Sequence, residues 1–191
     1  MTRPMFSQAP GGMPAALDAT EGSQLVELAV CLPLLVVFAV GIIDFGGAFN
    51  LKHKLDIAAQ QAARFASNQP SADITNFNPR STEAIHDFIL SSLLSANINT
   101  CGLAASAPTK QNLKWTYIAA SNCPGTLTLT IDRGYTFQSS GRNRLTMEAT
   151  HVTISYPYQW RFGRVIQLVA PGATYGGTSL ISAEAIAENL N

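Results

Sequence analysis

One segment constrains this chain more than any other. From Ser23 to Ile43 the only ionisable side chains are those of Glu27 and Cys31. The segment supplies roughly the 20 mostly apolar residues that an α-helix needs to cross the ~30 Å hydrocarbon core of a bilayer. A core helix of a soluble domain is usually amphipathic, whereas here leucine, valine, isoleucine and phenylalanine cover every face. The sequence therefore predicts one membrane-spanning helix, over residues 23–43.

Composition and charge argue against several classes of function. The chain has 12 Lys or Arg and 12 Asp or Glu, so the formal net charge is zero and no global field attracts nucleic acid. The three histidines, His53, His86 and His151, do not have the spacing of metal ligands, and no G-x-S-x-G, HExxH, Walker or paired Cys-His motif occurs. We therefore expect no metal, no cofactor, no nucleic-acid partner and no enzymatic activity.

The residues before the apolar run predict a leader. Residues 1–22 are rich in Pro, Gly and Ala and are not expected to fold. Glu27 is the fifth residue counted from Ser23, and a carboxylate in a membrane segment costs about 2.5 to 3.5 kcal/mol and by default has a function. Cleavage after Gly22 would create its partner, because the new α-ammonium of Ser23 would lie about one helical turn away, or beside the Glu27 of a neighbouring subunit. A secretory signal cleaved near residues 46–48 is the alternative, but acidic residues stand where such signals are basic.

The same region resembles the TadE-like family almost from end to end. The matching elements are Gly22, Val26-Glu27, Leu32-Pro33, Gly41-Ile42-Ile43-Asp44-Phe45-Gly46 and Ala62-Ala63-Arg64-Phe65-Ala66. Gly-x4-Glu alone is a weak signal, but the combination is specific.

The resemblance implies a minor pseudopilin of the tight-adherence (Tad/Flp) type IV pilus system, processed by a prepilin peptidase after Gly22. The implied partners are that peptidase, other pilins and pseudopilins, the inner-membrane Tad assembly platform and the lipid bilayer. The implied location is the bacterial inner membrane, crossed once, with the C-terminal head in the periplasm before any incorporation into the extracellular pilus. Charge alone would place the C-terminal side in the cytoplasm, because Lys52, His53 and Lys54 follow the span.

Helical periodicity continues past the span and predicts an amphipathic stem over residues 44–67. Its apolar positions recur at helical intervals, at Leu51, Leu55, Ala58, Ala62 and Phe65. Pro33 removes one helical hydrogen bond and predicts a kink or a local break. Asp44 with Gly46 and Gly47 predicts a second soft point at the membrane exit.

Residues 68–191 are expected to form a periplasmic head. Loop signals run to Thr82, and Ser81 or Thr82 is expected to cap a helix that ends near Ala96, with His86 facing solvent. Alternation then predicts antiparallel strands near 113–120, 126–137 and 145–158, with one bulge at Gly134 and a second near Thr150. Charged residues of this region are expected on a solvated rim, namely Asp132, Arg133, Arg142, Arg144, Glu148, Arg161 and Arg164. Residues 161–172 form a short amphipathic segment, and the last segment, which periodicity leaves open, is a strand by the family's pattern.

The expected fold class is therefore α+β: a long N-terminal transmembrane and stem helix, as in pilins, packed on a small antiparallel β-sheet head with one additional helix. Cys101 and Cys123 bracket a short strand, and in an oxidising compartment such a pair forms a disulfide readily. Closing a loop of this length stabilises a fold by about 3 kcal/mol in the chain-entropy model. Two free thiols remain the alternative.

Two rival functions make different predictions. A single-pass membrane-anchored binding or adhesion module would expose its aromatic side chains as one patch, drawn from Trp115, Trp160, Tyr156, Tyr158 and Tyr175. A membrane-anchored enzyme would gather a nucleophile, a base and oxyanion donors in one pocket. Ser155 and His151 share a strand face at best about 13 Å apart, which is too far for that purpose.

Overall fold

The computed structural model describes residues 19–138, 145–162, 172 and 177–190. The chain divides into two compact units between Ala39 and Val40, and helix α1 (Ala19–Ser67) contributes to both. The turn expected at residues 139–143 and most of the amphipathic segment expected at residues 161–172 lie outside the described residues.

The part of α1 in the first unit exposes apolar side chains in all directions. These include Leu25, Val26, Leu28, Val30, Leu32, Leu34, Leu35, Val36 and Phe38. A helix that is apolar all round needs lipid or other chains around it. The helix is long and apolar enough to cross a membrane, which fits a membrane-anchored protein.

Helix α1 is continuous over its whole length. It remains helical through Pro33, so the local break that was one of the two effects expected there does not occur, and it remains helical through Gly46 and Gly47. No break occurs at residues 44–47, where this turn packs against the head as described below, and the soft point expected there stays a prediction.

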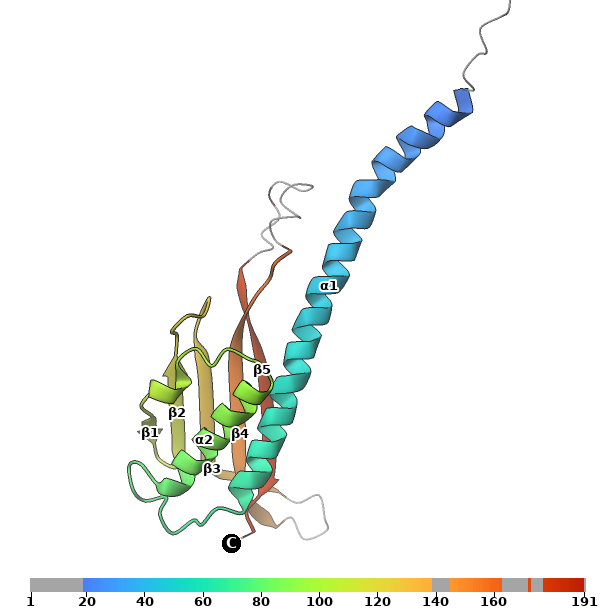
Figure 1. Ribbon diagram of the computed structural model, residues 1–191. Helices are drawn as coiled ribbons and strands as arrows, with labels where there is room; N and C mark the ends of the chain where they lie inside the picture. Colours follow the sequence, from blue (N-terminus) through green and yellow to red (C-terminus); the bar gives the residue numbers. More distant parts are fainter. Residues whose placement is uncertain (1–18, 139–144, 163–171, 173–176, 191) are drawn as a thin grey trace, which may run out of the picture. The chain divides into compact units, whose positions relative to one another are not determined.

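The second unit is an α+β head built on a five-stranded antiparallel sheet (Figure 1), which confirms the expected fold class. After α1 come α2 (Arg80–Ser95) and the short 3-10 helix η1 (Leu103–Ala105). The strands are β1 (Thr109–Gln111), β2 (Lys114–Ala119), β3 (Leu127–Gln138), β4 (Thr146–Gln159) and β5 (Thr178–Glu188). They lie in the sheet in chain order, each antiparallel to the next. The last segment is the strand that was expected.

The irregularity between β3 and β4 is a single bulge. The register shifts between Asp132 and Tyr135, so that Arg133 and Gly134 lie opposite Thr150. The expected bulge at Gly134 is confirmed, but the second bulge near Thr150 is wrong, because β4 pairs with β5 without interruption from Ala149 to Gln159. The alternation of apolar and polar residues in β4 breaks near Thr150 because Thr150 lies opposite the bulge in β3.

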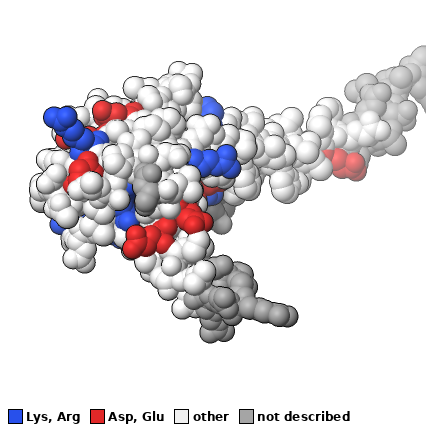
Figure 2. Space-filling model, turned by 90° about the horizontal axis from the view of Figure 1, so that it is seen from below, with Lys and Arg blue, Asp and Glu red and all other residues white. Residues whose placement is uncertain are grey.

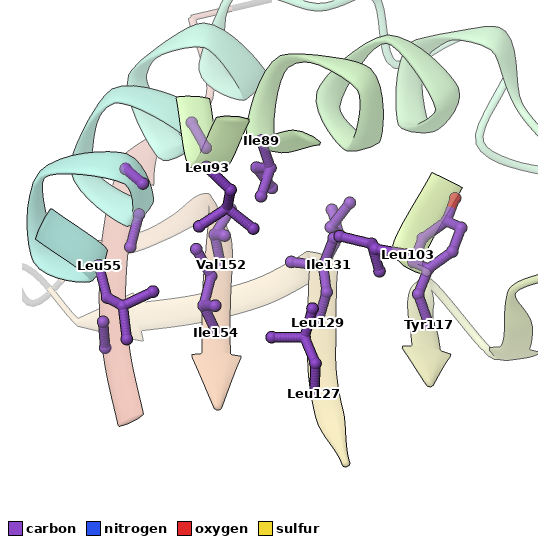
Figure 3. Close-up of a cluster of buried hydrophobic side chains, with 14 of the residues drawn as sticks. Leu55, Ile89, Leu93, Leu103, Tyr117, Leu127, Leu129, Ile131, Val152 and Ile154 are labelled. Carbon is purple, nitrogen blue, oxygen red and sulfur yellow. The ribbon is translucent and has the colours of Figure 1, made fainter. Parts of the chain in front are cut away.

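Helices α1 and α2 cover one face of the sheet, and the core lies between the helices and this face (Figure 3). The stem part of α1 presents Leu55 and a stripe of buried alanines at positions 58, 59, 62, 63 and 66. Helix α2 adds Ile85, Ile89 and Leu93, and the strands add Trp115, Leu127, Leu129, Ile131, Val152 and Ile154.

Three expectations around α2 and the bulge are wrong. The N-cap residue is Pro79, which makes no side-chain cap hydrogen bond. Ser81 caps nothing, since its hydroxyl and its backbone N–H both donate to the Asp73 carboxylate, and Thr82 is fully buried. His86 is 7% exposed, stacked on Tyr117 with ring centroids 4.5 Å apart, and its Nε2 lies 3.2 Å from the Leu103 carbonyl. Arg133, expected on the rim, is 3% exposed.

Candidate functional site

The expected processing and assembly residues all lie in the first turns of α1. The helix begins at Ala19, so the Gly22–Ser23 peptide bond belongs to its first turn. The first four N–H groups of a helix have no partner within it, and this turn therefore opens more easily than the rest.

Ser23 and Glu27 are four residues apart in α1, which is about one helical turn. Glu27 is exposed among apolar neighbours, with Leu25 and Val26 before it and Leu28 after it. Within the described residues, Glu27 has no ion-pair or hydrogen-bond partner. The carboxylate is thus available to a group supplied by cleavage or by another chain.

Asp44 is a buried, hydrogen-bonded side chain whose role in packing sequence reasoning missed. It is 4% exposed, although it directly follows the apolar run. Its Oδ2 accepts hydrogen bonds from the backbone N–H groups of Arg161 and Phe162, both at 2.9 Å, and its Oδ1 accepts one from the Tyr158 hydroxyl at 3.0 Å. The carboxylate therefore ties α1 to the end of β4 and presents no free charge at the membrane exit.

Small residues on the same face of α1 make this contact possible. A Cβ at Gly47 would lie 2.9 Å from the Tyr158 hydroxyl, and one at Gly41 would meet the Phe162 ring at 3.7 Å. Gly41, Asp44, Gly47 and Leu51 recur at intervals of three and four residues, which places them on one face of the helix. That spacing, with a carboxylate in its middle, was the available signal for a packing site.

A groove of about 760 Å³ adjoins Asp44. Asn50 and Lys54 line it from α1, Asn97 and Asn99 from the loop after α2, and Tyr156 from β4. Lys54 donates to the Ala96 carbonyl at 2.9 Å. Burial raises the pKa of Tyr156.

Two bonded pairs fasten the loops of the head. Cys101 and Cys123 form a disulfide with their Cα atoms 5.4 Å apart. Arg133 donates from Nη1 to the Pro70 carbonyl and to Ser81 Oγ, and from Nη2 to the Gln69 carbonyl, which fixes the loop before α2. Burial lowers the pKa of Arg133, an effect that the charge of Asp73 opposes. For Asp73 partial burial acts to raise the pKa, but hydrogen bonds from Ser81 and the charge of Arg133 leave it below its ordinary value.

The residues of the rival functions are partnered in other ways. His151 contacts Thr153 and Glu184, while Ser155 is hydrogen-bonded to Ser182, so the structure does not bring this serine and histidine together. The described residues contain no group of three or more potential metal ligands. Trp115 is fully buried, and Tyr175 lies outside the described residues. The face seen in Figure 2 carries both signs of charge interspersed, without a basic patch for nucleic acid.

Comparison with known proteins gave one family. A family model described as TadE-like protein matches residues 22–64. Neither the curated proteins nor the solved structures gave a match. The matched segment begins at Gly22, contains Glu27, Pro33 and Asp44, and ends within the stem part of α1, so it leaves the rest of the head outside the match. Residues 22–64, which form most of α1, are therefore similar to TadE-like proteins, and they precede an α+β head.

Proposed function

We propose that this chain is a minor pseudopilin of a Tad pilus, a structural and assembly subunit that a prepilin peptidase processes after Gly22. The observation that carries the proposal is the arrangement at the start of α1. The TadE-like match begins at Gly22, and Glu27 lies exposed on an apolar helix without a partner in the described residues. The proposed location is the inner membrane, with the head in the periplasm, where the Cys101–Cys123 disulfide is stable.

Cleavage would give Glu27 its partner. The new N-terminus at Ser23 is an ammonium at the positive end of the helix dipole. The Glu27 carboxylate, one turn later in the helix, offsets both the ammonium charge and the positive end of the dipole. When subunits associate, pairing Glu27 with the Ser23 ammonium of the same chain or of a neighbour removes an unpaired charge from a medium of low dielectric constant. Only one axial register allows this pairing between chains, so the polar pair sets the height at which neighbouring heads stand. The proposed partners are the prepilin peptidase, other pilins and pseudopilins, and the inner-membrane assembly platform.

The processing step is tested with Gly22→Leu in cells that contain an active prepilin peptidase. Intact-mass measurement of the purified unaltered chain should give a protein that begins at Ser23, whereas Gly22→Leu should retain residues 1–22 because the side chain obstructs the peptidase. Gly46→Leu is the matched control. It places the same side chain on the same helix where a Cβ meets nothing within 4 Å, and it should be cleaved normally.

A full-length mass for the unaltered chain in these cells would contradict the proposal. So would a mature chain that starts at Phe49, since that start indicates cleavage of a secretory signal.

A further inference from the structure

The inference concerns the face of α1 that the head leaves uncovered just after the apolar run. Ile42, Phe45 and Phe49 are 73%, 52% and 72% exposed. They are three and four residues apart and therefore form one stripe along the helix. The opposite face of the same turns carries Asp44, Gly47 and Ala48 and packs on the head.

The head contributes an aromatic side chain to this stripe. Trp160, directly after β4, contacts Phe45 edge-on with ring centroids 5.2 Å apart, and Tyr158 contacts Trp160 in the same manner at 5.1 Å. The indole N–H of Trp160 donates to Ser179 Oγ at 2.8 Å. We call the surface formed by Ile42, Phe45, Phe49 and Trp160 the apolar edge. All four residues belong to the second unit.

Charge marks where the apolar edge ends. After Glu27 the next acidic or basic side chain is Asp44, whose carboxylate is buried and hydrogen-bonded, so no exposed charge precedes Phe49 on this stretch of helix. Lys52, His53 and Lys54 then follow, and the exposed Arg161 stands next to Trp160. Tryptophan at the boundary, with basic side chains just beyond it, is the pattern of a protein surface at the level of lipid headgroups.

Length agrees with this placement. The segment from Leu25 to Phe49 has 25 residues, several more than the roughly 20 that a helix needs to cross a hydrocarbon core of ~30 Å. The excess matches the interfacial layer, and the apolar edge is continuous with the span, since Ile42 belongs to both.

We propose that the apolar edge lies in the interfacial layer of the bilayer, so that lipid covers Phe45, Phe49 and Trp160 and the head stands directly on the membrane surface. The ligand is the boundary between acyl chains and headgroups, which accepts both the apolar rings and the neighbouring cations. This inference rests on membrane anchoring by α1, and neither cleavage after Gly22 nor pilus assembly enters into it.

The chain has two tryptophans, which makes a matched measurement possible. Trp160 belongs to the apolar edge, whereas Trp115 is 0% exposed in the core of the head. In Trp115→Phe only Trp160 emits, and in Trp160→Phe only Trp115 emits. Each full-length variant is reconstituted into phosphatidylcholine and phosphatidylglycerol vesicles, with and without lipids brominated near the headgroup end of the acyl chains.

Brominated lipid should lower Trp160 emission about twofold and leave Trp115 emission unchanged, because bromine quenches on contact and interfacial indoles meet the upper acyl chains. Aqueous iodide should quench Trp160 weakly. Strong quenching by iodide without quenching by bromine would place the apolar edge in water and overturn the inference. Protection from both quenchers would show that protein, such as a second copy of this chain, covers the edge, and would overturn it as well.

Two further measurements keep each outcome decisive. If circular dichroism shows that Trp115→Phe does not fold, the unaltered chain is labelled with 5-fluorotryptophan and studied by fluorine NMR. The Trp160 resonance is the one that is missing in Trp160→Phe. Nitroxide-labelled lipid should broaden this resonance and leave the Trp115 resonance unchanged. Flotation separates the possible failures. A chain that does not float with the vesicles refutes anchoring by α1, whereas a chain that floats with an unquenched Trp160 refutes the interfacial contact alone.

Discussion

Replacing Asp44 with alanine should loosen the contact between α1 and the end of β4. The side chain accepts three hydrogen bonds while 4% exposed, and alanine leaves the N–H groups of Arg161 and Phe162 without an acceptor, while the Tyr158 hydroxyl keeps the backbone carbonyl of residue 44 at 3.1 Å. Hydrogen bonds to charged groups contribute about 1.5 to 3 kcal/mol each, but desolvation of the carboxylate offsets part of this and water can reach the exposed Arg161. We therefore expect a loss of about 2 to 4 kcal/mol for Asp44→Ala. Asp44→Asn retains an acceptor oxygen, and we expect a loss of about 1 kcal/mol.

Hydrogen exchange measures this loss where it arises. In the full chain held in lipid nanodiscs, the amides of Arg161 and Phe162 should exchange about 30-fold faster or more in Asp44→Ala, since 1.4 kcal/mol corresponds to a factor of ten in the opening equilibrium. Asp56→Asn is the control, because it removes a carboxylate from the same helix. Asp56 pairs with Lys52, but the two side chains are 33% and 42% exposed respectively, so the pair contributes only about 0.5 kcal/mol. Unchanged exchange of both amides in Asp44→Ala would refute the role given to this carboxylate.

Three further predictions concern the head and the start of α1. Asp73 has a lowered pKa in the fold, so its carboxylate stabilises the head at pH values above the ordinary carboxyl range, and this stabilisation is lost as the pH falls through the lowered pKa. Asp73→Asn should therefore reduce the free energy of unfolding at pH 7 by about 1 kcal/mol. Urea denaturation should show that this difference shrinks in acid, and a difference that grows in acid would contradict the prediction. Replacing Cys101 and Cys123 together with serine should lower the free energy of unfolding by about 3 kcal/mol, and peptide mapping that recovers both thiols free from the native envelope would contradict the bridge. Glu27→Gln should be inserted, cleaved and folded normally, because the apolar run outweighs a few kcal/mol, yet fail to cross-link with other pilins; a normal fibre from this variant would remove the carboxylate from the assembly step.

Periodic patterns predicted the helices and strands of this fold well, because each pattern depends only on which side chains within one short segment face the core. The apolar run gave α1, and clean alternation at Leu127, Leu129 and Ile131 gave β3 with its buried face. Gly134 marked the bulge, but the broken alternation near Thr150 was interpreted as a second one. A bulge has two sides, and the sequence does not show that two irregularities in different strands face each other.

Polar residues were harder to place, since their position depends on partners far along the chain. Arg133 is buried because carbonyls of Gln69 and Pro70 and the Ser81 hydroxyl meet its guanidinium, and nothing near Arg133 in the sequence indicates this. His86 is buried against Tyr117 and Leu103 for the same kind of reason. For Asp44 the small residues around it were visible, but the two backbone donors come from positions more than a hundred residues later.

The strands lie in the sheet in the order in which they occur along the chain, and this has a consequence for how the head forms as the chain is synthesised. Each strand pairs with the one before it, so every new strand finds a partner that has already been made. Loop closure stays short at each step, and the disulfide between Cys101 and Cys123 can close before β3 is complete. The Tyr158 hydroxyl lies near the end of β4, and the two backbone donors to Asp44 follow β4, 117 residues after Asp44 for the Arg161 amide. The contact between Asp44 and the end of β4 therefore belongs to the late steps of folding, and a chain stalled before β4 would leave the carboxylate of Asp44 unbonded.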